Sequence, residues 1–159
     1  MVRRIVLITI VALTAAFAAS SPPDELSGPV TRSQILAAAP DWEPNLAAYQ
    51  PKTEALEALK KVAEPVLIET YFATWCSDSK AHVPALFSVL DRADNPLLQA
   101  SYTALPRAKA ERSRFIPEGR AIDKLPTFIV FLNGREIGRI VETPAHSVEE
   151  DLAALLLRR

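Results

Sequence analysis

Residues 71–80 read Tyr71-Phe72-Ala73-Thr74-Trp75-Cys76-Ser77-Asp78-Ser79-Lys80 and join two segments of different periodicity. Before them, Pro65 to Phe72 is a short run rich in β-branched and aromatic side chains, which predicts a central strand buried on both faces. After them, Ala81 to Leu90 repeats its apolar side chains at helical spacing, which predicts a helix. We therefore expect Cys76 at a strand-to-helix junction.

The composition is that of one folded domain with extensions. The chain has 159 residues, of which 49% are apolar and 23% are charged, enough for one hydrophobic core. The formal net charge is -1, so no electrostatic footprint indicates nucleic acid or an anionic membrane surface as a partner. We expect no nucleic acid partner, no membrane association of the mature form, and a monomer.

The first twenty residues have the features of an export signal. Arg3 and Arg4 are followed by an apolar run from Ile5 to Phe17 and by small residues that suit a cleavage site. We predict a signal peptide at 1–20 and a periplasmic or secreted protein. An uncleaved anchor or a buried helix is the alternative.

The segment from 21 to 50 is predicted to be a linker followed by an N-terminal helical extension. Ser21 to Pro29 is rich in Pro, Ser and Gly, and we expect little order there. Thr31 to Ala39 and Asp41 to Pro51 are predicted helical stretches, and Lys52 to Ala63 is a predicted amphipathic helix.

The C-terminal part alternates between strand and helix signals. A strand is predicted at Thr127 to Phe131, a hairpin turn at Asn133-Gly134, a return strand at Glu136 to Val141, and a helix at Val148 to Leu157 capped by Ser147. The stretch between Leu97 and Lys124 is less regular. It suggests a strand at Ser101 to Leu105, then a basic loop or short helix at Pro106 to Arg114, which we expect to be solvent-exposed.

This order of elements, with its motifs, resembles the thioredoxin family from about Leu56 to the C-terminus. Residues 71–80 look like the family's strand, Trp-Cys-x-x-Cys motif and following lysine, and Pro84 matches the proline that kinks its active-site helix. Leu125-Pro126-Thr127 looks like the family's cis-proline loop. The resemblance implies an α/β thioredoxin fold over 51–159, a central mixed β-sheet flanked by helices, with the N-terminal helical extension before it. Trp-Cys-Ser-Asp-Ser itself resembles an exported bacterial subgroup that has serine at the second cysteine position.

The resemblance also implies a set of site residues. They are Cys76, Ser79 and Pro126 as catalytic residues, Trp75, Leu125 and Thr127 as substrate-binding residues, and Asp78 and Lys80 as modulating residues. The chemistry suits the first turn of a helix, where free backbone N–H groups and the helix dipole favour a thiolate. Lys80 would add to this effect if its side chain folds back, whereas Asp78 would oppose it.

Two departures from the family pattern limit that chemistry. Ser79 cannot act as a resolving thiol, so release of a mixed disulfide would need an external thiol, such as glutathione or a second protein. Thr70 stands where the family has a buried acid. Glu69 beside it is expected on the opposite face of the strand, because adjacent strand residues alternate.

Cys76 is the chain's only cysteine, so it is either a reactive thiol or a buried, inert one. The first hypothesis is a monothiol thiol-disulfide oxidoreductase acting on protein thiols or disulfides, with glutathione as a further candidate partner. The alternative is a redox-inactive peptide- or protein-binding module. Iron–sulfur cluster binding, as in monothiol glutaredoxins, fits neither the motif nor the compartment. We expect no cofactor and no metal, since His82 and His146 have no ligand spacing with Cys76.

Overall fold

The computed structural model describes residues 25–158, so the signal peptide expected at 1–20 lies outside the described residues. The strands are β1 (Gly28–Val30), β2 (Val66–Phe72), β3 (Leu98–Ala104), β4 (Thr127–Leu132) and β5 (Arg135–Val141). The helices are α1 (Arg32–Ala38), α2 (Glu43–Ala48), α3 (Thr53–Lys60), α4 (Ser77–Ala93) and α5 (Val148–Leu157), with 3-10 helices η1 (Pro40–Trp42) and η2 (Lys109–Arg114). In the part of the chain that is described, no helix is both long and apolar enough to cross a bilayer.

The five strands form one mixed sheet in the order β1-β3-β2-β4-β5. β2 and β3 are parallel, and every other neighbouring pair is antiparallel. The prediction of an α/β fold with a central mixed sheet flanked by helices is confirmed. β2 lies near the centre of the sheet, as predicted, but it is not buried over its whole length on both faces, because Leu67 is 38% exposed and Glu69 is partly exposed.

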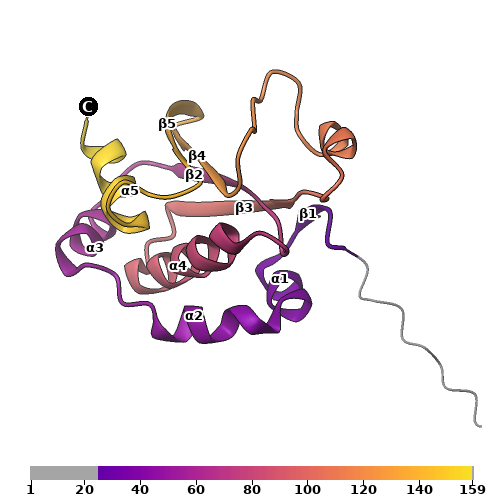
Figure 1. The fold of residues 1–159 in the computed structure, drawn as a ribbon. Coiled ribbons are helices and arrows are strands. Elements are labelled where there is room, and N and C mark those ends of the chain that lie inside the picture. Colours follow the sequence, from indigo (N-terminus) through magenta and orange to yellow (C-terminus); the bar gives the residue numbers. More distant parts are fainter. Residues whose placement is uncertain (1–24, 159) are drawn as a thin grey trace, which may run out of the picture.

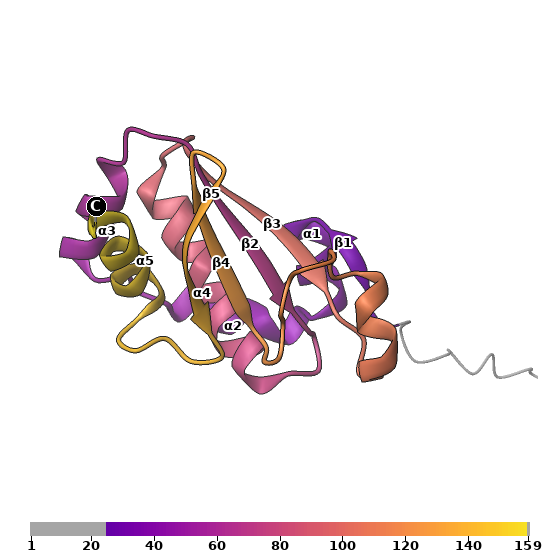
Figure 2. The ribbon, with the colours of Figure 1, turned by 90° about the horizontal axis from the view of Figure 1, so that it is seen from above.

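The two faces of the sheet are covered differently, as Figures 1 and 2 show. On one face, α2 to α5 pack around a large core that includes Phe72, Phe87 and Phe128. On the other face, the segment 105–126, with η2 in it, lies over a smaller core built on Tyr71 and Ile129. The alternation of β2 side chains divides them between these two cores.

The N-terminal extension is helical and belongs to the main core. Thr31 caps α1 in a reciprocal capping box with Gln34, which satisfies two backbone donors at the helix start. Ile35 and Trp42 are both fully buried, and the Trp42 indole meets Phe72 edge to face at 5.9 Å. The expectation of little order from Ser21 to Pro29 was wrong for Gly28 and Pro29, which pair with β3 at the sheet edge together with Val30.

α4 contains Pro84, which cannot donate the backbone hydrogen bond that the Lys80 carbonyl would otherwise accept. Asn45 of α2 supplies the missing donor, because its Nδ2 lies 2.9 Å from that carbonyl oxygen. The extension therefore completes the backbone hydrogen bonding of the first turns of α4.

The C-terminal hairpin and helix follow the predicted pattern. Asn133 and Gly134 both have positive φ, the conformation that a two-residue hairpin turn of this kind requires. Ser147 accepts a hydrogen bond from the Glu150 amide and caps α5. α5 packs so closely on β5 that a Cβ at Gly138 would clash with Leu155 Cδ2.

One buried carboxylate connects α5 to the chain before α3. Glu149 is 1% exposed and accepts hydrogen bonds from the Tyr49 hydroxyl at 2.6 Å and from the Lys52 amide at 2.9 Å. Burial pushes the pKa of Glu149 upward, but these hydrogen bonds outweigh it, so the pKa lies below its ordinary value. The folded state thus favours the ionised carboxylate.

Candidate functional site

Sheet topology brings the chemically interesting residues together at one edge. β2 and β3 run parallel, so the loops after them both leave the sheet at its carboxyl end, and antiparallel β4 starts there. Trp75 and Cys76 follow β2, Arg107 follows β3, and Leu125-Pro126 precedes β4. Segments that are distant in sequence therefore meet around Cys76.

Cys76 occupies the N-cap position of α4 and is half-buried. Its side chain makes no capping hydrogen bond; its Sγ instead donates to the Leu125 carbonyl at 3.4 Å. The Leu125–Pro126 peptide bond is cis, as the resemblance implies. Because the amides at a helix start lack partners within the helix, those of α4 are free to stabilise a sulfur anion.

Ser79 is fully buried, and its hydroxyl accepts a hydrogen bond from the Ala73 amide at 3.2 Å. It thereby fixes the loop between β2 and α4. Among the described residues, no hydrogen bond joins the Ser79 hydroxyl to the Cys76 sulfur. Thr127 is also buried, and its hydroxyl donates to the Lys124 carbonyl at 2.7 Å, so this side chain stabilises the turn before β4.

The two modulating residues point to different neighbours. Lys80 does not fold back toward the sulfur, because its Nζ forms an ion pair with Asp41 at 2.6 Å. Asp78 is half-buried, and its negative charge favours the protonated, charged forms of Lys124 and His82. Burial lowers the pKa of His82, against an opposing effect of the Asp78 carboxylate.

Glu69 and Thr70 lie on opposite faces of β2, as the strand alternation predicted. Thr70 is 1% exposed and faces the main core, where its hydroxyl has no hydrogen-bond partner among the described residues. Glu69 is bound by the Arg120 guanidinium through two hydrogen bonds of 3.2 and 3.3 Å. Glu69 is therefore held in an ion pair on the face away from Thr70, which leaves no carboxylate at the buried position.

Comparisons with known proteins agree with this architecture. A chloroplastic thioredoxin Y from Oryza sativa subsp. japonica is 31% identical over 98 residues, covering 62% of this chain and 49% of that protein. A thioredoxin from Echinococcus granulosus is 28% identical over 101 residues, covering 64% of this chain and 87% of that protein. The chain has a thioredoxin-like fold. Sequence similarity at this level supports the thioredoxin-like superfamily.

The structural comparison concerns the fold alone. A protein of unknown function from Pseudomonas aeruginosa matches with a TM-score of 0.50 at 20% identity, over 78% of this chain and 75% of that chain. No family model matches the sequence. The chain spans about half the length of the rice thioredoxin Y.

The candidate site has two further residues that the sequence reasoning missed. The guanidinium of Arg107 lies 4.7 Å from the Trp75 ring centroid, and that of Arg112 lies 5.3 Å from it. Both belong to the basic stretch that was expected to be solvent-exposed, yet Arg112 is half-buried. The sequence shows that this stretch is basic, but no pattern in it predicts that the arginines contact Trp75.

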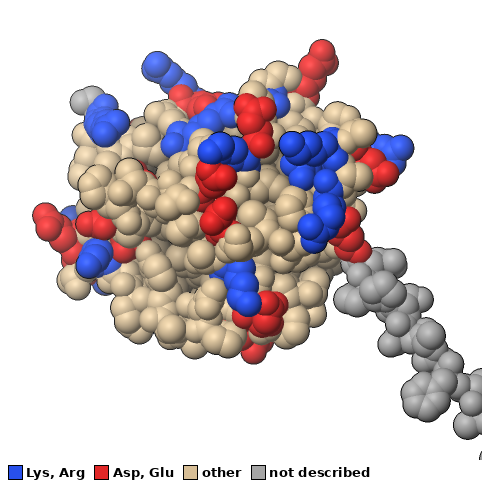
Figure 3. All heavy atoms as spheres, in the orientation of Figure 1, with Lys and Arg blue, Asp and Glu red and all other residues tan. Residues whose placement is uncertain are grey.

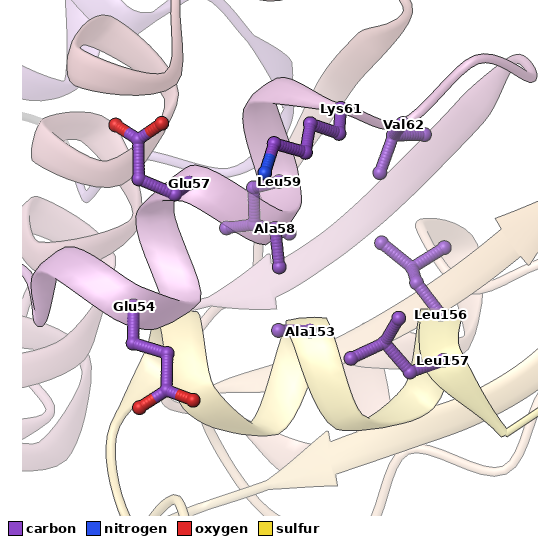
Figure 4. Close-up of a pocket in the computed structure, with 9 residues that line it drawn as sticks. All are labelled: Glu54, Glu57, Ala58, Leu59, Lys61, Val62, Ala153, Leu156 and Leu157. Carbon is purple, nitrogen blue, oxygen red and sulfur yellow. The ribbon is translucent and has the colours of Figure 1, made fainter.

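One concave region of the surface is formed by two helices. It is a groove of about 460 Å³ between α3 and α5, lined by side chains that include Leu59, Val62 and Leu156 (Figure 4). Its walls carry no part of the residues 71–80 motif. The groove is therefore separate from the candidate site.

Proposed function

We propose that this protein is a monothiol thiol-disulfide oxidoreductase in which Cys76 is the attacking thiol. The observation that carries the proposal is the position of Cys76 at the N-cap of α4, half-exposed, with its sulfur 3.4 Å from the Leu125 carbonyl beside the cis-proline. A nucleophilic sulfur needs access and a positive electrostatic environment, and a helix start supplies the second.

The proposed reaction is an exchange with balanced atoms and electrons. The Cys76 thiolate attacks one sulfur of a substrate disulfide, a Cys76–substrate disulfide forms, and the other substrate sulfur leaves with the electron pair and takes up a proton. Ser79 cannot break the new bond, so an external thiol attacks it, forms a disulfide with the substrate and restores Cys76 as a thiol. The substrate class is protein disulfides and thiols, with glutathione as a candidate external thiol.

Leu125 would position the substrate through its backbone, whereas Thr127, buried in β4 between β2 and β5, would act by holding the turn before β4. An extended peptide can pair with the exposed backbone of a segment that runs past the reactive sulfur. Leu125 is the residue whose carbonyl contacts Cys76, so a bound peptide would displace the thiol from that carbonyl as the sulfur reacts.

Export to the periplasm or the medium completes the proposal and rests on the predicted signal peptide. Export can be tested by determining the N-terminal residue of the protein that an expressing cell secretes. A mature chain that begins near residue 21 supports export, and an intact N-terminus in the cytoplasm contradicts it.

A redox-inactive binding module is the second candidate, and the buried hydroxyl of Ser79 favours it. That side chain already has a structural partner in the Ala73 amide, so the motif is also explained as a folded loop without chemistry. The two candidates differ in what Cys76 must do.

Trapping of Cys76 with a small uncharged disulfide, hydroxyethyl disulfide, separates them. We expect the purified mature protein to form a mixed disulfide that a second thiol releases, at a rate at least about tenfold above that of a free cysteine peptide. Cys76→Ser should abolish the adduct while leaving the thermal unfolding curve almost unchanged. A rate equal to that of the free peptide would contradict the oxidoreductase and leave the binding module.

A further inference from the structure

The surface beside Cys76 is asymmetric in charge. The segment 106–124 contains six basic and three acidic residues, in a chain whose formal net charge is -1. Figure 3 shows Lys and Arg side chains gathered on the upper right, where Figure 1 places the segment after β3. The positive charge therefore lies on the side of the candidate site that η2 covers.

Three cations near the site are already neutralised by carboxylates. Lys80 pairs with Asp41, Lys124 pairs with Glu142, and Arg120 is bound to Glu69. These ion pairs offer little to an incoming anion, because each charge already has a partner.

Lys109 and Arg114 of the same segment have no ion pair among the described residues, but Arg107 and Arg112 are the two basic residues of the segment that lie on Trp75. Neither guanidinium forms an ion pair with a carboxylate within residues 25–158. Arg112 donates to the Pro106 carbonyl at 2.9 Å and to the Arg107 carbonyl at 3.4 Å, which fixes its orientation without neutralising it. Both cations lie against Trp75, the residue directly before Cys76.

Contact with the indole prepares these arginines for an anion. An aromatic ring attracts a guanidinium over its face and limits the side-chain freedom that would otherwise be lost on binding. The planar guanidinium can then present its N–H donors to a carboxylate in a paired arrangement.

We propose that Arg107 and Arg112, held on Trp75, form an anion-binding subsite that selects disulfide substrates with acidic residues next to the cysteine. The inference rests on the proposed function, since the subsite would act by orienting a substrate for Cys76. The occupant is an acidic peptide segment. Two cations on one aromatic ring match one or two carboxylates, whereas a nucleic acid backbone needs a longer series of cations.

The test compares three synthetic peptides with the same single cysteine, blocked in each as a mixed disulfide with 2-mercaptoethanol. The cysteine is flanked by two Glu, two Gln or two Lys. When Cys76 attacks the peptide sulfur, 2-mercaptoethanol leaves as a thiolate and is protonated, so the leaving group is the same throughout. We expect the Glu peptide to react about tenfold faster than the Gln peptide at low salt, and the Lys peptide to react more slowly than both.

Variants assign the effect to the arginines. Arg107→Gln should reduce the Glu-to-Gln rate ratio at least about threefold, whereas Arg112→Lys, which keeps the charge near the ring, should reduce it less. Arg135→Gln is the matched control, because Arg135 is exposed at the hairpin, at the opposite end of the sheet, and its loss changes net charge equally. Raising the salt concentration from 50 to 500 mM should reduce the Glu-to-Gln rate ratio of the wild-type protein. This measurement tests the electrostatic origin of the preference without any substitution.

The two proposals fail in different ways. If Cys76 does not react with hydroxyethyl disulfide, the proposed function is wrong. If Cys76 reacts with it but the three peptides react equally, or if Arg135→Gln lowers the ratio as much as Arg107→Gln, the subsite is wrong. A preference for glutathione disulfide without a preference for the Glu peptide would also overturn the peptide subsite, because the carboxylates would then belong to a small thiol.

Discussion

Replacing Asn45 with alanine is expected to destabilise the first turns of α4, where Cys76 is located. The Asn45 Nδ2 donates to the Lys80 carbonyl at 2.9 Å, and Pro84 has no N–H to donate in its place. Asn45→Ala therefore leaves a partly buried carbonyl without a hydrogen bond.

The magnitude follows from that single unpaired group. A buried acceptor without a partner costs about 1–3 kcal/mol, and the partial burial of this contact places Asn45→Ala at about 1–2 kcal/mol. For a chain of this size, that loss lowers the unfolding temperature by about 2–8 °C. Gln50→Ala is the control, because Gln50 is an exposed amide side chain in the same region, and it should change stability by no more than about 0.5 kcal/mol.

A double-mutant cycle with Pro84→Ala tests the reasoning. Alanine at position 84 has an N–H that can donate to the Lys80 carbonyl, so Asn45→Ala should cost much less in that background. Urea unfolding of the four proteins should give a coupling energy of about 1 kcal/mol between the two positions. Additivity within about 0.3 kcal/mol would refute the idea that Asn45 replaces the missing proline donor.

Three further predictions concern other parts of the chain. Glu149→Gln should lower the free energy of unfolding by about 1–3 kcal/mol at pH 7. Because the folded pKa of Glu149 is lowered, the difference in free energy of unfolding between wild type and variant should be full above about pH 4.3 and shrink as the pH falls through the folded pKa. Urea unfolding at acidic pH measures this difference, and a difference that is constant with pH would contradict the prediction. Gly138→Ala should lower the free energy of unfolding by about 1–3 kcal/mol, measured by thermal unfolding, because the new Cβ would meet Leu155. Adding Leu155→Ala should restore part of that stability. A double variant no more stable than expected from the two single changes would argue against the clash. Ser79→Cys should let a resolving thiol attack the Cys76 mixed disulfide, so that an insulin-reduction assay with dithiothreitol runs faster than with wild type, and an unchanged rate would mean that the new thiol cannot reach the sulfur.

Local patterns in the sequence predicted most of the elements that carry the site. The strand before Cys76 and the helix after it could be predicted from the sequence. The strand is a short run of mainly apolar residues, and the helix repeats its apolar residues at helical spacing over more than one turn. The Asn133-Gly134 turn was recoverable for a similar reason, since few residue pairs accept two positive φ angles.

Contacts between distant segments were not recoverable in the same way. Lys80 was a candidate to approach the sulfur, yet Asp41, 39 residues earlier, holds its ammonium group. A long, flexible side chain can reach several partners, and only the packing of the extension selects among them. β1 was missed because three residues are too few to show an alternating pattern.

The arginines on Trp75 illustrate the same limit. Their segment has no periodicity, and its place near Trp75 depends on β3 running parallel to β2. Sequence composition marked the stretch as basic, but the strand direction that carries Arg107 to the carboxyl end of the sheet is a property of the whole topology.

The burial of Ile35 and Trp42 gives residues 31–49 a second role besides holding α4. Because both side chains are 0% exposed and belong to the same core as Phe72 and Phe87, we expect this stretch to unfold with the rest of the molecule rather than ahead of it. A protease would find its peptide bonds only in globally unfolded molecules, so resistance to cleavage there measures the stability of the whole fold. Trimming the chain to its thioredoxin-like portion would remove part of the interior, and the shortened product would expose the aromatic surface that Trp42 covers.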